Sequence, residues 1–474
     1  MPRTIVAIDF GQGNTWMMRL EKAPVDIPDA RRPCPFNCIP QAMPSWDDPE
    51  AVKKHGLKLL KELENHPAVK QAIDQALMVP PGEISPVYFQ LTERAAEQLC
   101  WETLYSDNTA FLGLDARWPI GRIADSVVDR QLTPQEFSPP LKIAAVLSAL
   151  NRPAAEQWKS LRDAVDAARA DGLEVEVLLL VGEEALLDAI QGEVAGGMEW
   201  VHVAAVPDRT QELEGLLGGF EPHILHFFCH GSASHGVPRL EIATILDWMQ
   251  GNTTGSLKLS VENLQAMPAL RKVWLVVLNC CESGRADENS HSMAHMLVSN
   301  VVPAAIGTLE PFDASDAHEL SLGFFPLLFQ NLAEILAACS NGSVVELECA
   351  TALRGARRGL SEKHKNDPSN NREWAMPVLY TRKESFFLRI EGDAGVPPEQ
   401  VQIWQQRAEV VAGQLRALPP DTDPVVREAV LGILTDVPVW LKPDLFGEFD
   451  QPGQLQEIAV AVGNEQLKPI SSPQ

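Results

Sequence analysis

The sequence is short of positive charge. It has 39 lysine and arginine residues against 64 aspartate and glutamate residues, so its formal net charge is −25. Nucleic acids and anionic membrane surfaces are themselves negative and repel a chain of this kind. We therefore expect no direct nucleic-acid partner, and only a weak preference for basic partners or substrates.

Long apolar runs are also scarce. Asp9 interrupts the first apolar segment, where the apolar part of a signal peptide would have to continue. No uninterrupted apolar run approaches the ~20 residues that a bilayer-spanning helix needs. We expect no membrane span and a cytoplasmic location, in which the 8 cysteines stay reduced.

Signals for cofactors are few as well. Cys34 and Cys38 lack a second cysteine pair at zinc-binding spacing, so we expect no metal there. Residues 9–15, Asp-Phe-Gly-Gln-Gly-Asn-Thr, are similar to the first phosphate loop of actin-like ATPases, but no second phosphate loop follows. Residues 11–14 also suit a β-hairpin turn, which we favour over nucleotide binding. The sequence predicts neither a cofactor nor a metal site.

Two short apolar runs dominate what is present. Residues 222–231 end in His230-Gly231, and residues 273–284 contain Cys281 just beyond their apolar part. Continuous apolar runs of this length are typical of strands buried on both faces in a parallel sheet. Working residues in such sheets lie beyond the carboxyl ends of the strands. A thiol and an imidazole at adjacent strand ends form a nucleophile and its base.

The rest of the chain supports an α/β fold. Strands alternate with helices, which predicts a mostly parallel sheet sandwiched by helices. The predicted strands are 86–91, 141–147, 173–181, 224–229, 273–279 and 304–309, with 375–380 and 386–390 closing the sheet; the predicted helices are 51–64, 92–99, 154–170, 183–190, 291–298, 315–337 and 343–360. Thr92 is expected to cap its helix and Trp101 to pack in a core, while residues 232–272 form an insertion or hairpin over the site.

Four segments resemble the CHAT peptidases, caspase-like proteins of the clan that includes separase. Phe228-Cys229-His230-Gly231 and residues 278–284, Leu-Asn-Cys-Cys-Glu-Ser-Gly, are similar to that family's two site motifs. Residues 99–104 and 373–379 are similar to segments that precede and end the family's domain. The separation of the two site residues, 281 − 230 = 51, is near the roughly 50 of caspases. The resemblance covers about residues 140–392, and a weaker similarity extends over residues near 99–125.

The resemblance implies roles for individual residues. It aligns Cys281, rather than Cys280, with the nucleophile and His230 with the base, and it implies that the amides of Gly231 and Cys281 stabilise the oxyanion. Separase-like relatives bind Arg or Lys through an acid after the next strand, for which Asp313 and Asp316 are the candidates here. Both aspartates also suit the start of a helix near Asp316, where they would be caps. His226 and His235 are the alternative histidines nearby, one expected in the core and one in a loop.

We therefore predict a caspase-like cysteine endopeptidase that cleaves a protein substrate. The expected organisation is an N-terminal α+β region (1–139), a CHAT peptidase domain (140–392) and a helical C-terminal region (393–474). The resemblance implies a regulated effector in bacterial defence or cell death, switched on by a protein partner through the terminal regions. The alternative is a catalytically idle scaffold that uses the same core for binding.

Overall fold

The structure of the chain is a computed structural model. It describes residues 3–11, 15–37, 50–125, 134–234, 237–280, 283, 286, 290–339, 343–364, 367–369 and 371–390, together with isolated positions between 403 and 432. Cys281, His235 and nearly all of the C-terminal region expected at 393–474 lie outside the described residues. At the isolated positions from 403 to 430 the backbone is helical.

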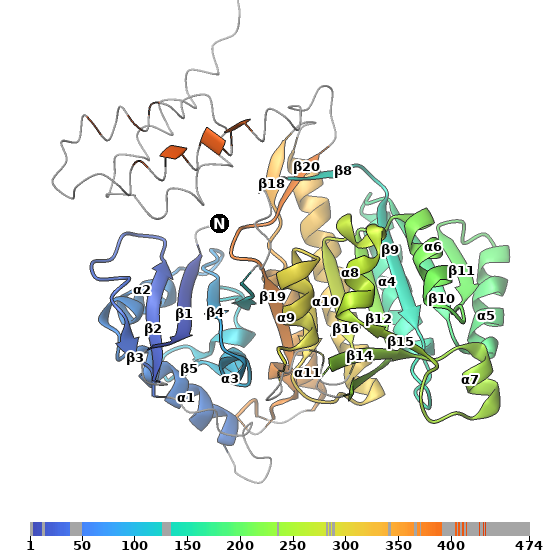
Figure 1. Cartoon of the computed structure of the whole chain (residues 1–474), viewed down its shortest axis with the longest axis horizontal. Helices are drawn as coiled ribbons and strands as arrows, with labels where there is room; N and C mark the ends of the chain where they lie inside the picture. Colours follow the sequence, from blue (N-terminus) through green and yellow to red (C-terminus); the bar gives the residue numbers. More distant parts are fainter. Residues whose placement is uncertain are drawn as a thin grey trace, which may run out of the picture.

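A single large sheet runs through the molecule (Figure 1). Among the described residues it has twelve strands, in the order β11 (Val201–Ala205), β10 (Val175–Val181), β9 (Leu141–Leu147), β12 (Ile224–Phe228), β16 (Leu275–Asn279), β17 (Ala304–Thr308), β19 (Pro377–Thr381), β7 (Ile120–Ile123), β4 (Val87–Leu91), β1 (Thr4–Phe10), β2 (Trp16–Lys22) and β3 (Cys34–Pro35). All neighbours from β11 to β17 are parallel, and so are β19, β7, β4 and β1. The predicted mostly parallel α/β fold is confirmed.

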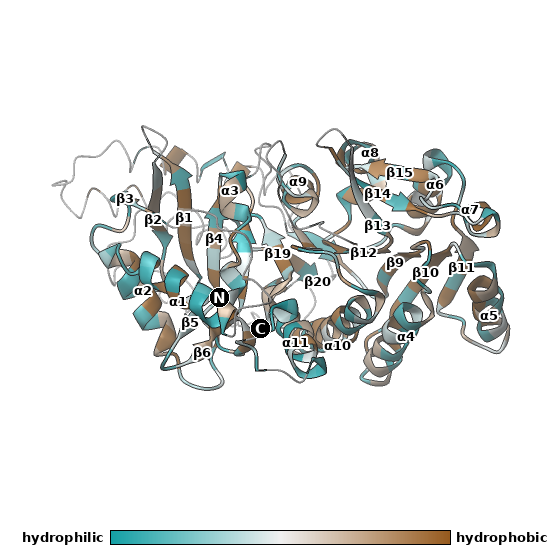
Figure 2. Cartoon of the chain, turned by 90° about the horizontal axis from the view of Figure 1, so that it is seen from below, coloured by the Kyte–Doolittle hydropathy of each residue, from teal (hydrophilic) through white to brown (hydrophobic). Residues whose placement is uncertain are grey.

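Helices cover both faces of this sheet, as Figure 2 shows. One face carries α4 (Ala155–Ala170), α5 (Glu184–Ala195), α10 (Ala314–Ala338) and α11 (Ala350–Lys363); the other carries α6 (Thr210–Phe220), α8 (Val261–Ala266) and α9 (Met293–Asn300). Every residue of β12, β16 and β17 is buried between the layers. This burial on both faces explains why these strands are mostly apolar.

Helix α10 has the length and composition of a membrane span, although the sequence of this helix contains no long uninterrupted apolar run. It has 25 residues, with a mean hydropathy of 1.4 over its most apolar window. In the structure it packs against α4 and α11, and its buried residues recur every three or four positions from Asp316 to Leu332. That spacing is typical of a helix that turns one side to the core of a folded domain.

The N-terminal residues form a lobe of the same sheet. β1 and β2 pair as an antiparallel hairpin, with Phe10 opposite Trp16 and the amide of Gly11 bonded to the Thr15 carbonyl, which confirms the predicted hairpin. A separate hydrophobic cluster, drawn from residues between Val6 and Ile120, fills this lobe. The boundary expected between 139 and 140 stays a prediction. Strands from both sides of it join one sheet, and the larger hydrophobic cluster also draws residues from both sides, among them Tyr88 and Phe137 on the N-terminal side.

Some local predictions were wrong. The helix expected at 343–360 begins at Ala350, because β18 (Val344–Glu346) pairs with β20 (Phe387–Ile390) in a small sheet completed by β8 (Gln135–Phe137). β20 accordingly does not close the main sheet. Thr92 does not cap α3 (Arg94–Glu97), since its hydroxyl bonds to Ile8 and Asp9. Trp101 is buried and stacks on Phe89, as expected.

Candidate active site at the strand ends

The predicted base lies where the order of the strands reverses. From β9 the chain moves outward through β10 to β11, then returns to β12 and continues through β16 to β17. In sheets of this kind the carboxyl ends of the strands on either side of the reversal diverge and leave a crevice, where ligands bind. His230 follows the end of β12 and is half-buried there.

A backbone carbonyl orients the His230 ring. Nε2 of His230 lies 2.7 Å from the carbonyl oxygen of Leu150, in the loop after β9. Because a carbonyl oxygen only accepts hydrogen bonds, Nε2 must donate its proton. The neutral ring then has its lone pair on Nδ1, which is the nitrogen that is able to take a proton from a thiol. Sequence reasoning missed Leu150, since a backbone acceptor has no residue signature.

The neighbouring strand brings its end to the same place. β12 and β16 pair in parallel register, with Phe228 opposite Asn279, so Cys229 and Cys280 are the next residues on the two strands. Cys280 is only 5% exposed and its carbonyl oxygen accepts a 2.8 Å hydrogen bond from the Thr308 hydroxyl. Cys281, the predicted nucleophile, follows directly in the sequence and lies outside the described residues.

Ser283 anchors the segment that follows β16. Its hydroxyl lies 3.0 Å from the carbonyl oxygens of both Leu278 and Cys280, and it accepts a 3.1 Å hydrogen bond from the amide of Thr308. Its own carbonyl accepts the amide of Ala294 at the start of α9. Cys280 and Ser283 are therefore fixed to β17 and α9. The Cys-x-Ser-Gly motif contains the signal for this serine, although its anchoring role is not visible in the sequence.

A small separate sheet begins at the predicted base itself. β13 (His230–Ser234) pairs with β14 (Val237–Ile242), which pairs with β15 (Leu257–Ser260). The antiparallel pairing confirms a hairpin within residues 232–272, while its place over the site stays a prediction. Gly231 lies in β13 opposite Leu240 and is half-buried. The second proposed oxyanion donor, the amide of Cys281, lies outside the described residues.

The other histidines of this region have different surroundings. His223 precedes β12 at its amino end, where its ring stacks on Trp274 and accepts the amide of Lys142. His226 is 1% exposed, as predicted for a core residue, but its Nδ1 finds no hydrogen-bond partner among the described residues. Burial lowers the pKa of His223 to about 4 and that of His226 to about 3. His235 lies outside the described residues.

The two candidate substrate-binding aspartates differ in exposure. Asp313 is the N-cap of α10, where its carboxylate accepts the amide of Asp316, yet its side chain remains 68% exposed. Asp316 is nearly buried and its carboxylate bonds to Lys363 at 2.5 Å and to His364 at 2.8 Å. Arg152 links the start of this helix to the predicted site. It lies two residues after Leu150, and its guanidinium donates a hydrogen bond to the Phe312 carbonyl.

A group of possible metal ligands includes neither residue of the predicted dyad. Among the residues described, Glu97, His291 and His295 bring three ligand atoms to within 4.8 Å of one another. His291 and His295 belong to the segment that begins α9, so a His-x-x-x-His spacing was the signal that the sequence offered. Sequence reasoning missed it, because Glu97 comes from the distant N-terminal lobe.

Comparison with known proteins identifies the family of the chain. The CHAT domain family matches residues 67–382. No curated protein sequence matches the chain. Two crystal structures of the Saccharomyces cerevisiae separase–securin complex, at 3.0 and 2.6 Å resolution, are similar in fold at 12% identity, with TM-scores of 0.34 and 0.32 over 69% and 70% of this chain. The matched part makes up 17% of the solved separase chain. Since the family match spans two thirds of the sequence, the chain belongs to the CHAT domain family.

Proposed function

We propose that the chain is a cysteine endopeptidase in which Cys281 is the nucleophile and His230 the base. The observation that carries the proposal is the hydrogen bond between His230 Nε2 and the Leu150 carbonyl, at the point where the strand order reverses. It fixes the ring and leaves Nδ1 as the proton acceptor. The family match supports the same chemistry, because CHAT domains resemble caspase-like peptidases.

The burial of Cys280 supports Cys281 as the nucleophile. Cys280 is 5% exposed, and Thr308 and Ser283 both bond to its carbonyl oxygen. A thiol enclosed in this way has no room for a substrate carbonyl beside it. Position 281 is the next residue along, at the carboxyl end of β16, where parallel sheets present their reactive side chains.

The proposed reaction follows from these roles. His230 Nδ1 takes the proton from the Cys281 thiol, and the thiolate attacks the carbonyl carbon of the scissile amide. The negative oxygen that forms is stabilised by the amides of Gly231 and Cys281. His230 returns its proton to the leaving amine as the C–N bond breaks. Water, deprotonated by the same imidazole, then hydrolyses the thioester and frees the thiol.

For the substrate, we propose a basic residue before the scissile bond, bound at Asp313. This carboxylate is exposed at the start of α10, and Arg152 ties that helix start to the loop that holds His230. Asp316 is the weaker candidate, because it is nearly buried and bonded to both Lys363 and His364, whereas Lys363 lies 3.9 Å from the exposed Asp313 carboxylate. The net charge of −25 would also favour a cationic peptide.

Covalent labelling tests the catalytic residues. A peptidyl electrophile that alkylates thiolates should add to Cys281 in the wild-type chain, as mapped by mass spectrometry of the digested protein. His230→Ala should slow the labelling roughly 10²–10⁴-fold, the usual contribution of a positioned base. Cys280→Ala is the matched control and should label normally. If the folded wild-type chain is not labelled, or if Cys280 carries the label, the proposal fails. Absence of labelling would favour the alternative of a catalytically idle scaffold.

A cleavage profile tests the substrate. On a peptide library, the wild-type enzyme should prefer Arg or Lys before the cut, and Asp313→Asn should reduce kcat/KM for those peptides more than for neutral ones. A preference that survives Asp313→Asn would exclude this carboxylate. A profile without basic residues would exclude the substrate class while leaving the dyad in place.

A further inference from the structure

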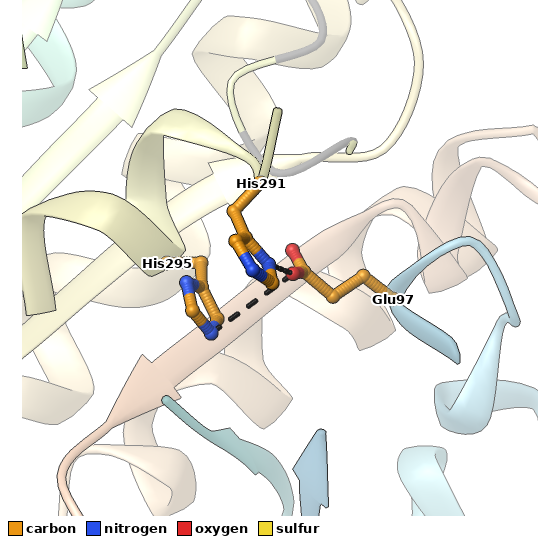
Figure 3. Close-up of side chains that lie close together, drawn as sticks. All are labelled: Glu97, His291 and His295. Atoms are coloured by element: carbon orange, nitrogen blue, oxygen red, sulfur yellow. Dashed lines mark hydrogen bonds and ion pairs between the residues drawn. The ribbon is translucent and has the colours of Figure 1, made fainter. Parts of the chain in front are cut away.

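A buried carboxylate and two histidines meet between the N-terminal lobe and α9 (Figure 3). Glu97 ends α3 and is fully buried, His295 lies on α9 and is 6% exposed, and His291 precedes α9. The two imidazole rings stack 4.1 Å apart, and both turn a nitrogen toward the carboxylate. None of the three belongs to the proposed dyad.

The three ligand atoms have the spacing of a metal site. Nδ1 of His291 contacts Oε1 of Glu97, Nε2 of His295 lies 3.9 Å from the same oxygen, and all three atoms lie within 4.8 Å of one another. In a tetrahedral zinc site with bonds of about 2.1 Å, ligand atoms stand roughly 3.4 Å apart. Side-chain movements of about an ångström would therefore suffice to place an ion between them.

One of these atoms has no well-formed hydrogen bond. Nε2 of His295 makes no hydrogen bond of ordinary geometry among the described residues, although it is buried, faces the Glu97 carboxylate and belongs to a ring that interacts with the backbone of Leu91. Native proteins rarely leave a buried polar atom unpaired, so such an atom requires an explanation. A metal ion bound to Nε2 would supply one.

The surrounding groups hold the ligands as metal sites require. The other nitrogen of His295 faces the Ser299 hydroxyl at 3.4 Å. The second oxygen of Glu97 accepts hydrogen bonds from the Tyr380 hydroxyl at 3.0 Å and the Ser292 amide at 3.3 Å, which leaves Oε1 for an ion. Outer hydrogen bonds of this kind orient ligands and raise their basicity. The His291 side chain is 33% exposed and provides a path of entry.

We propose that Glu97, His291 and His295 bind a divalent transition-metal ion, with zinc as the best match. Two imidazoles and one carboxylate are a ligand set that zinc uses, with water completing the tetrahedron. Magnesium and calcium prefer oxygen ligands and fit this set poorly. The ion would join α3 of the N-terminal lobe to α9, the helix that follows the segment containing Cys281.

Metal content tests the proposal directly. The full chain, stripped with a chelator and dialysed against zinc, should retain about one ion more than its His291→Gln variant, because a structural zinc site needs its full ligand set. His202→Gln, which changes an exposed histidine on β11, is the matched control and should retain the wild-type amount. Equal zinc content in the wild-type chain and His291→Gln would overturn the proposal.

Two further measurements test whether the ion is bound by these three residues rather than by cysteines. Cobalt should give the visible absorption of a tetrahedral site in a Cys281→Ala chain, without a thiolate charge-transfer band, which excludes binding by cysteine. Zinc should raise the Tm of the wild-type chain but not that of Glu97→Gln, whose fold is checked by circular dichroism. A cobalt spectrum dominated by thiolate ligands would count against the site. None of these readouts depends on peptidase activity, so failure here leaves the proposed function intact.

Discussion

At the scale of single residues, the proposed site depends on hydrogen bonds rather than on a third catalytic side chain. The carbonyl of Leu150 orients His230, and the hydroxyls of Ser283 and Thr308 hold the carbonyl of Cys280, the residue before the proposed nucleophile. The place of His230 after β12 could be predicted, because it ends an apolar run at a recognisable motif, whereas Cys281 lies outside the described residues and its role stays a prediction. The supporting contacts could not be predicted, since they depend on backbone atoms brought together from different strands.

Ser283 offers the first prediction. Ser283→Ala leaves the buried amide of Thr308 without its acceptor, which should lower the free energy of unfolding by about 1–3 kcal/mol. The loosened segment should also slow the labelling of Cys281. Urea denaturation and labelling rates measure the two effects. Thr109→Ala, which removes a hydroxyl from an exposed hairpin, is the control and should change neither; a Ser283→Ala chain that behaves like it would refute the anchoring role.

Buried histidines predict a dependence of stability on pH. Burial, the largest cause in each case, lowers the pKa of His55 and His223 to about 4 and that of His226 to about 3. The unfolded chain binds their protons near pH 6.5 and the folded chain does not, so their contribution is complete above that pH and is lost as the pH falls toward 4. Each histidine should contribute a slope of about 1.4 kcal/mol per pH unit in this window.

Replacing one of these histidines isolates its contribution to the pH dependence of the unfolding free energy. His226→Met removes a titrating group from the core while keeping a side chain of similar size. The decline of the unfolding free energy between pH 6 and pH 4 should become shallower by about one such slope, as urea titrations at each pH would measure. His202→Gln, at an exposed position, should keep the wild-type profile. Parallel profiles for His226→Met and the wild type would show that His226 is protonated in the folded state.

At the scale of elements, two glycines determine how closely α10 and α11 pack. A Cβ at Gly323 would stand 2.6 Å from the backbone of Ala356, and one at Gly355 would stand 2.1 Å from the Gly323 carbonyl oxygen. Backbone cannot yield as a flexible side chain does. Gly323→Ala should therefore separate the helices and destabilise the fold by about 1–3 kcal/mol.

The matched control lies on another helix. A Cβ at Gly192 in α5 meets nothing within 4 Å, so Gly192→Ala should be neutral or stabilise the helix by up to about 1 kcal/mol. Both variants are compared by urea unfolding with the slope checked for constancy. If Gly323→Ala proved as stable as Gly192→Ala, the two helices would have to pack less closely than described.

Strands of the core were easier to predict than those at its margins. β9, β10, β12, β16 and β17 are mostly apolar, with one polar residue each, because both of their faces are covered. β11 was not predicted, because it is an edge strand with an exposed histidine, His202, at its second position and lacks the apolar run of a buried strand. β18 and β20 pair across more than forty residues in a separate small sheet, and no local periodicity reveals such a pairing.

At the scale of the whole molecule, the two lobes share a buried network of charges. The guanidinium of Arg122, on β7, forms a 2.7 Å ion pair with Glu102, and both side chains are fully buried. It also donates to the carbonyl of Glu97 and to the Tyr380 hydroxyl of β19. The network thus connects the N-terminal lobe to β19, the strand that joins this lobe to the rest of the sheet.

Breaking the ion pair between Arg122 and Glu102 should lower the stability of the fold strongly. Glu102→Gln leaves a buried guanidinium without a counter-charge, and we expect a loss of about 3–5 kcal/mol in the free energy of unfolding. Asp115→Asn breaks the half-exposed pair with Arg117 and should cost less than about 1 kcal/mol. Denaturant midpoints of the two variants measure the difference. Similar losses would indicate that water reaches Arg122.

The sequence also predicted separate regions on either side of residue 140, but not that they share one sheet. The joining pair, β7 with β19, sets Arg122 beside Tyr380, whose side chains lie 258 residues apart in sequence. Pairings over such a separation leave no trace in local hydrophobic patterns. They follow from which strand edges remain open once the local elements have formed.

The central place of β19 has a consequence for synthesis. β17 and β7 each use one edge to pair with β19, so until Pro377–Thr381 leaves the ribosome, both strands have an unpaired edge and the sheet exists as two halves. Open edges of this kind invite pairing with other chains. A nascent or truncated chain that ends before residue 377 should therefore aggregate or bind chaperones, and the complete sheet closes only after the last of its strands is made.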